Sequence, residues 1–79
     1  SQAMQILIMQ SEMSFISDSI ANLQSRRKDV VRLVKRGRSP RSDRIKIDVS
    51  IEKLSHQLQN LRIQHEQLLT DLQQALGLK

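Results

Sequence analysis

The 79-residue chain contains no cysteine, tryptophan or tyrosine, and only one phenylalanine, one proline and two glycines. Without cysteine it can form no disulfide and offers no thiolate to a metal. The scarcity of aromatic and turn-forming residues excludes a β-sandwich or barrel, which needs many strands joined by turns. The longest apolar run, from Ile6 to Met9, is far too short to span a bilayer. We therefore expect no membrane insertion.

The residue combinations of catalytic sites are also missing. The sequence has no glycine-rich phosphate loop and no nucleophile beside a base. His56 and Glu52 are spaced for one helix face, but two ligands are weak support for a metal site. No signal-peptide pattern is present. We expect a non-enzymatic, intracellular protein that carries no cofactor or metal.

Two long stretches of the chain have apolar residues at alternating spacings of three and four. This spacing produces the a and d positions of a heptad repeat, the pattern of helices that pack as a coiled coil. Eight of nine such positions are apolar in each stretch. The first stretch has Ile6, Met9, Met13, Ile16, Ile20, Leu23, Arg27, Val30 and Val34 at these positions. The second has Ile47, Ile51, Leu54, Leu58, Leu61, His65, Leu68, Leu72 and Ala75.

The segment between the two stretches has the features of a tight turn. Gly37 suits the left-handed conformation that follows a helix end. Ser39 suits the N-cap of a second helix, with Pro40 in its first turn and Asp43 as an alternative cap. The sequence therefore predicts one all-α domain over residues 1–79, a two-helix antiparallel coiled-coil hairpin. We expect helix 1 over residues 3–36, a turn over 37–42 and helix 2 over 43–77.

The two seams also predict a register. In an antiparallel pair, the residue numbers of facing positions add up to a constant. Pairing Val34 with Ile47 gives 81, and this sum matches every seam position of one helix with a seam position of the other. We expect nine layers without interruption.

Two of these layers contain a polar residue. In the predicted register Arg27 faces Leu54, and His65 faces Ile16. Arg27 can extend its guanidinium to solvent near the turn, or serve as a polar seam residue that fixes register or partner choice. His65 can be a hydrogen-bonded seam histidine or a pH-sensitive layer.

Positive charge is concentrated around the turn. Ten of the thirteen basic residues lie between Arg26 and Lys46, against Asp29 and Asp43, so this segment carries +8. In a hairpin it forms one end of a rod, which we call the basic tip, and we expect it to bind an anionic partner. The candidate contact residues are Arg26, Arg32, Lys35, Arg36, Arg38, Arg41, Arg44 and Lys46.

The opposite end of the predicted hairpin is rich in apolar residues outside the seam. Two helices alone cannot cover these side chains, and exposed apolar patches usually mark an interface. We expect self-association into a helical bundle through Leu7, Ile8, Phe15, Leu69 and Leu76.

These features favour a protein–protein interaction and assembly module with a protein partner. Nucleic-acid binding by the basic tip is an alternative, although no aromatic residue lies among the arginines to stack on bases. The segments "SDRIKIDVSIEKL" and "LRIQHEQL" resemble the second helix of Rho-binding HR1 modules, over less than half of the chain. This resemblance implies a second alternative, a hairpin that binds a small GTPase.

Overall fold

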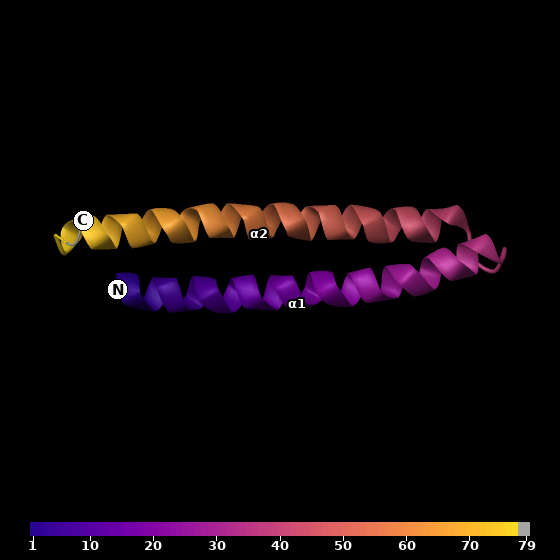
Figure 1. The fold of residues 1–79 in the computed structure, drawn as a ribbon, viewed down its shortest axis with the longest axis horizontal. Coiled ribbons are helices and arrows are strands. Elements are labelled where there is room, and N and C mark those ends of the chain that lie inside the picture. The colour runs from indigo at the N-terminus through magenta and orange to yellow at the C-terminus, as the bar shows by residue number, and fades with distance from the viewer. Residues whose placement is uncertain (78–79) are drawn as a thin grey trace.

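The computed structural model describes residues 1–77, apart from the side chain of Gln2. It consists of two helices, α1 (Gln2–Lys35) and α2 (Arg41–Ala75). The helices lie side by side along their length, and the chain reverses direction between them (Figure 1). The prediction of an all-α hairpin is confirmed. The observed helices begin and end within two residues of the predicted bounds.

The end of α1 has the geometry that its glycine predicts. Gly37 has a φ of +71°, the left-handed region that only glycine enters at low cost. Its N–H donates to the Val34 carbonyl at 3.0 Å, and the Arg38 N–H donates to the Leu33 carbonyl at 2.8 Å. These two bonds form a Schellman motif, which satisfies carbonyls that the helix end would otherwise leave unpaired.

The start of α2 differs from the prediction. Pro40, in an extended conformation with ψ of 153°, is the N-cap, and no side chain caps the helix. Neither Ser39 nor Asp43 takes that role, so the predicted cap is wrong. Because Pro40 is still extended, the helix begins at Arg41, one residue later than a Ser39 cap would place it and two residues before the predicted bound at 43. Asp43 lies in the first turn, where the partial positive charge of the helix N-terminus favours a carboxylate.

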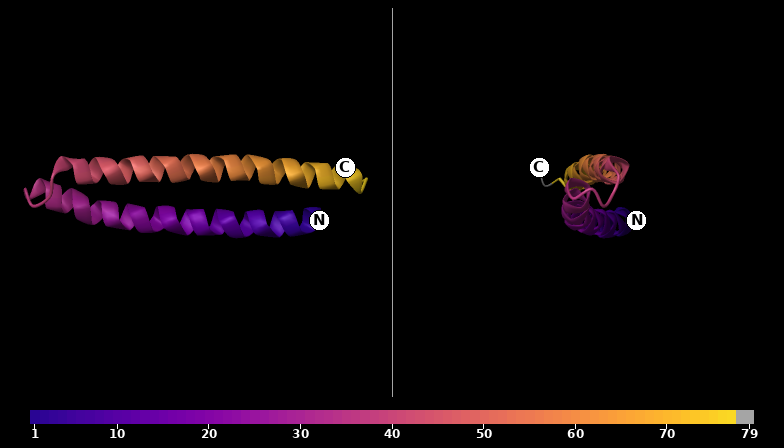
Figure 2. Two further views of the ribbon diagram at one scale, coloured as in Figure 1. Left: turned by 180° about the vertical axis from the view of Figure 1, so that it is seen from behind. Right: turned by 90° about the vertical axis from the view of Figure 1, so that its right-hand side faces the viewer.

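The predicted seam faces the other helix, but two helices bury it only in part. Seventeen of the eighteen seam side chains are buried or half-buried, the exception being Ala75. Only Ile6 and Leu58, at 9% and 8% exposure, count as buried among the described residues. Viewed end-on, residues 1–77 form just the two helices, with no third element over either groove (Figure 2). Each groove of the seam therefore remains open to solvent.

The predicted register is wrong by about one heptad. Among the described residues, two polar side-chain contacts join the helices away from the turn: Arg27 with Asp48, and Gln10 with His65. The residue numbers of both pairs add up to 75 rather than 81. This difference slides the helices past each other by about 9 Å. Accordingly, α2 extends beyond the N-terminus of α1, and Ala75, the predicted partner of Ile6, is exposed (Figure 1).

The turn agrees with this register. Only Arg36–Pro40 separate the helices, and Lys35 and Arg41, whose numbers add up to 76, lie at nearly the same level. Moving one helix by seven residues leaves a and d positions facing a and d positions, so the apolar pattern permits both registers. The compact turn at Gly37 goes with the observed register.

The hairpin is far more extended than a compact domain. Its radius of gyration is 18.0 Å, against about 12 Å for a compact chain of this length. Its accessible surface is 6270 Å², against about 4,900 Å² for a compact monomer of this mass. The excess reflects the elongated shape, in which each helix packs on one side only.

Candidate functional site

The two ends of the rod have different surfaces. We call residues 21–57 the tip half, and residues 1–20 with 58–77 the open half. The tip half carries a net charge of +7 and the open half −3. The hairpin brings together residues that are distant in sequence in both halves, and each half contains one of the two predicted sites.

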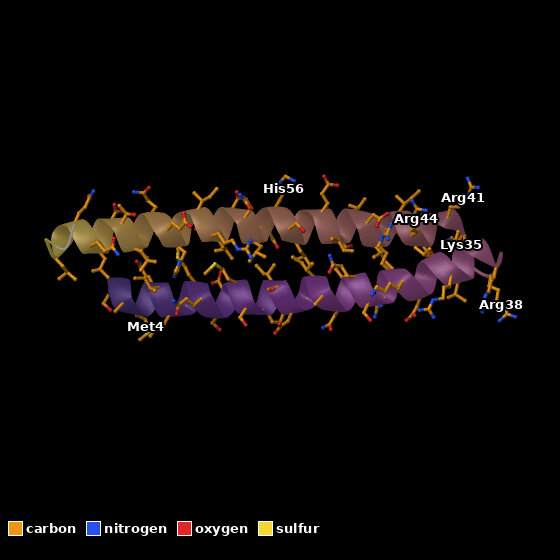
Figure 3. All side chains as sticks on the ribbon, in the orientation of Figure 1. Met4, Lys35, Arg38, Arg41, Arg44 and His56 are labelled. Carbon is orange, nitrogen blue, oxygen red and sulfur yellow. The ribbon has the colours of Figure 1, made fainter. Side chains whose placement is uncertain are left out.

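The structure places all eight predicted basic side chains in exposed positions. Lys35, Arg38, Arg41 and Arg44 come from the end of α1, the turn and the start of α2, and they gather at one end of the rod (Figure 3). Arg38 and Arg41 point away from the rod in different directions. Arg26 lies farther from the turn, about two and a half helical turns before Lys35.

An ion-pair cluster joins the helices behind the tip. Arg27 Nε donates to Asp48 Oδ1 at 2.5 Å, and Arg44 Nε lies 3.7 Å from Asp48 Oδ2. The hydrogen bond from Arg27, with attraction to Arg27 and Arg44, holds the pKa of Asp48 below its usual value. The side chains of Arg27 and Asp48 are 39% and 40% exposed, so water screens the pair and limits its strength.

The outermost basic residues have no such partner. Arg32 lies 3.9 Å from Asp29. Within the described part of the chain, no acidic group lies within 4 Å of Lys35, Arg36, Arg38 or Arg41. Because these side chains are spread around a convex end, they suit an extended anionic surface better than a small enclosed anion.

The predicted oligomer interface falls on two faces of the open half. Leu7, Ile8, Phe15 and Leu76 are exposed, with Phe15 at 73%, whereas Leu69 is half-buried. The heptad pattern places Ile8 and Phe15 beside one groove between the helices. It places Leu7, Leu69 and Leu76 beside the other, on the side where Asp48 meets Arg27. We call the first side the grooved face.

The grooved face carries two shallow, largely apolar hollows. The hollow in the open half contains Ile8, Met9, Leu61, Ile63 and Leu68, with Glu12 and Asp71 at its edge. The hollow in the tip half contains Leu23, Val49 and Leu54, with Glu52 and Lys53 at its edge. Both open on the same side of α2, because their lining includes residues that repeat at seven-residue intervals. These are Ser50 and Gln57 in the tip half, and Gln64 and Asp71 in the open half.

The two histidines lie in different surroundings. Half-buried His65 faces α1, and its Nε2 lies 3.4 Å from Gln10 Nε2, within hydrogen-bond distance. The predicted register placed His65 opposite Ile16, and this pairing is wrong. His56 is exposed and points away from α1 (Figure 3). Among residues 1–77, no group of three or more His, Asp or Glu side chains is placed to hold a metal ion.

Sequence reasoning missed two features. It did not pair Arg27 with Asp48, because the predicted register placed Arg27 opposite Leu54; the i,i+4 spacing of Arg44 and Asp48 was the available signal. It also missed the exposed apolar residues of the tip half. Leu33, Ile45 and Val49 stand one or two positions from the seam and could have been found by that spacing.

The fold and its two surfaces define an all-α hairpin with a basic end and an apolar, mildly acidic end. Comparisons with models of protein families, with curated proteins and with solved structures find no match. Neither helix, over the described residues, is long and apolar enough to cross a membrane.

Proposed function

We propose that the chain is a non-enzymatic coiled-coil module for assembly and protein–protein interaction. The grooved face associates with a second copy, and the basic tip binds an anionic partner. The observation that carries this proposal is the incomplete burial of the seam: among the described side chains only Ile6 and Leu58 are buried, while large apolar side chains stay exposed along the rod.

A second hairpin is the occupant that fits the grooved face best. Both hollows lie on this face, so a rod of equal length covers them together. Burying a side chain the size of Ile8 or Ile63 contributes roughly 1.5–3 kcal/mol. A few such residues from each copy are sufficient for a dimer at micromolar concentration, after the cost of association.

Sedimentation equilibrium tests the assembly with two matched variants. Ile8→Ser with Ile63→Ser removes apolar surface from the grooved face, and we expect the dimer Kd to rise about a hundredfold. Leu7→Ser with Leu76→Ser removes a similar exposed area beside the other groove. It should leave the Kd nearly unchanged. These side chains are all more than half exposed, so both variants should keep the helical circular dichroism of the hairpin.

A monomeric wild-type chain at tens of micromolar would refute the assembly. Equal weakening by the two variants would refute the assignment to the grooved face. In that case, the side with Leu7, Leu69 and Leu76 would share the interface.

For the tip, an acidic protein surface is the partner that the side chains favour. Binding by exposed arginine and lysine needs only negative charge. Base stacking needs aromatic side chains, and the single aromatic residue, Phe15, lies in the open half. It precedes Lys35 by twenty residues of helix, about 30 Å. Nucleic-acid binding by the tip would therefore rest on phosphate contacts alone.

A further inference from the structure

We infer that the two copies of the assembly lie end for end, so that the basic tip half of each packs beside the acidic open half of the other. This inference rests on the proposed self-association and adds the orientation of the second copy. It makes the charges of the rod part of the interface that its apolar residues form.

The first argument is the charge of each half. The open half has one basic residue among its described positions, Arg62. Its four acidic residues are all exposed: Glu12, Asp18, Glu66 and Asp71. If two rods packed with their tips together, +7 would lie beside +7. If they packed end for end, each +7 would lie beside −3.

Screening does not remove this difference. Axes of packed helices lie 8–10 Å apart, which is close to the Debye length of about 8 Å at physiological ionic strength. Charges on adjoining halves therefore interact. Charges at opposite ends of a rod 61 Å long do not. The favoured orientation is the one that separates the two tips.

The second argument is the position of the charges around the two hollows. Glu12 and Asp71 stand at the edge of the open-half hollow, whereas Glu52 and Lys53 at the edge of the tip-half hollow offset each other. Both hollows are on the grooved face. Consider a twofold axis that lies in the interface and crosses the rod at right angles near its middle. This axis turns one copy end for end and covers each hollow with the opposite half of the partner. Each acidic edge then lies over a basic half, and the contact is the same from both sides.

The tip half has more positive charge than the open half can neutralise. The residues around the turn also lie at the very end of the rod. Arg36, Arg38 and Arg41 therefore remain available to another anionic partner in this arrangement.

Fluorescence energy transfer tests the orientation, because the chain has no cysteine and single labels can be placed freely. Ser42→Cys labels the tip and Ala3→Cys labels the open end; both positions are exposed. Donor on Ser42→Cys copies mixed with acceptor on Ala3→Cys copies should give strong transfer. Donor and acceptor both on Ser42→Cys copies should give weak transfer, since the tips are separated by nearly the length of the rod.

The reverse pattern, strong tip-to-tip transfer and weak tip-to-end transfer, would overturn the orientation while leaving the self-association in place. A lack of transfer in both mixtures, together with a monomeric mass in sedimentation, would overturn the proposed assembly and the orientation with it. The two failures are therefore distinguishable.

A pair of charge reversals gives a second test. Glu12→Lys with Asp71→Lys reverses the acidic edge of the hollow and should raise the dimer Kd about tenfold at low salt, because surface pairs contribute up to about 1 kcal/mol each. Asp18→Lys with Glu66→Lys makes the same change of charge outside the two hollows and should have a smaller effect. No weakening by the first variant, or tighter association, would contradict the end-for-end arrangement.

Discussion

The tip half and the open half share one apolar seam and one register, yet their surfaces differ in almost every other respect. In the tip half the helices are joined by the charged contact of Arg27 with Asp48. In the open half they are joined by Gln10 and His65. The tip half is strongly basic, and the open half is weakly acidic with exposed Phe15 and Ile8. The seam thus specifies the rod, and the residues outside it specify what each end can bind.

The largest expected effect concerns the register that both halves share. Leu23→Cys with Ile51→Cys should form a disulfide within one chain under mild oxidation. These two positions face each other in the observed register, since their residue numbers add up to nearly 75. Leu23→Cys with Leu58→Cys, the pair of the register with sum 81, should not. A level difference of about 9 Å leaves their Cα atoms farther apart than the roughly 7 Å that a disulfide can bridge.

Non-reducing electrophoresis at high dilution measures this difference. Preferential crosslinking of Leu23→Cys with Leu58→Cys would show that the hairpin has the other register in solution. Crosslinks that form only between chains would show that the helices do not fold back on each other.

The second prediction concerns the charge of the tip. Replacing Lys35, Arg36, Arg38 and Arg41 with Gln should weaken binding to poly-glutamate about a hundredfold or more at low salt, as loss of several ionic contacts does for polyanions. The helices should stay intact, because none of the four has an acidic partner in the described structure. Arg44 is retained because it lies 3.7 Å from Asp48.

The control moves the same change of charge away from the turn. Replacing Arg26, Lys28, Lys53 and Arg62 with Gln should cost less affinity in the same titration. An equal loss would show that net charge, rather than the tip, drives binding. Tighter binding to duplex DNA than to poly-glutamate at physiological salt would favour the nucleic-acid alternative.

The third prediction compares the two glycines that end the helices. Gly37 and Gly77 both have a φ of +71°, and a Cβ added to either would meet no atom within 4 Å. The left-handed conformation costs an alanine about 1–2 kcal/mol. Gly37→Ala should lower the free energy of unfolding by about this amount, because the turn cannot relax without disturbing both helices. Gly77→Ala should cost much less, since the last turn of α2 extends past α1 and can unwind.

Urea unfolding followed by circular dichroism, at one fixed chain concentration, measures both variants. Equal costs would mean that the end of α2 is held as firmly as the turn. That result would point to a partner covering the open end.

The smallest expected effect concerns Asp48 and pH. Its pKa is lowered from an ordinary value of 3.8, so its ionised form stabilises the fold. This contribution is present above the ordinary pKa and is lost as the pH falls through the lowered one. Asp48→Asn should therefore reduce the Tm slightly at pH 6 and have no effect in strong acid. In an Arg27→Gln background the same substitution should have a smaller effect at pH 6, and an unchanged effect would show that Arg27 is not the partner.

The sequence predicted the parts of the fold that depend on local pattern. The seam from Ile6 to Val34 identified the buried side of α1, and Gly37 identified the end of that helix. Both predictions succeeded because side-chain periodicity and left-handed glycine are properties of a few consecutive residues. The N-cap was predicted wrongly at Ser39, because the choice between neighbouring caps depends on how the whole turn crosses from one helix to the other.

The candidate surfaces could be predicted in composition but not in arrangement. The sequence indicated a basic tip and an apolar open end, and the structure shows the predicted side chains to be exposed, except half-buried Leu69. The heptad pattern separated Leu7 and Leu76 from Ile8, but it could not show where the apolar hollows lie, because they form only when a second helix is in place. It also could not show which basic residues are paired, since Arg27 reaches Asp48 across the hairpin.

By itself, the sequence determined that this chain forms two amphipathic helices joined by a short turn. The tertiary structure alone decided how far one helix slides along the other. A heptad seam looks nearly the same after a shift of seven residues, so the apolar pattern permits residue-number sums of 81 and of about 75. The folded chain has the second register, in which Lys35 lies nearly level with Arg41 and Arg27 is within reach of Asp48.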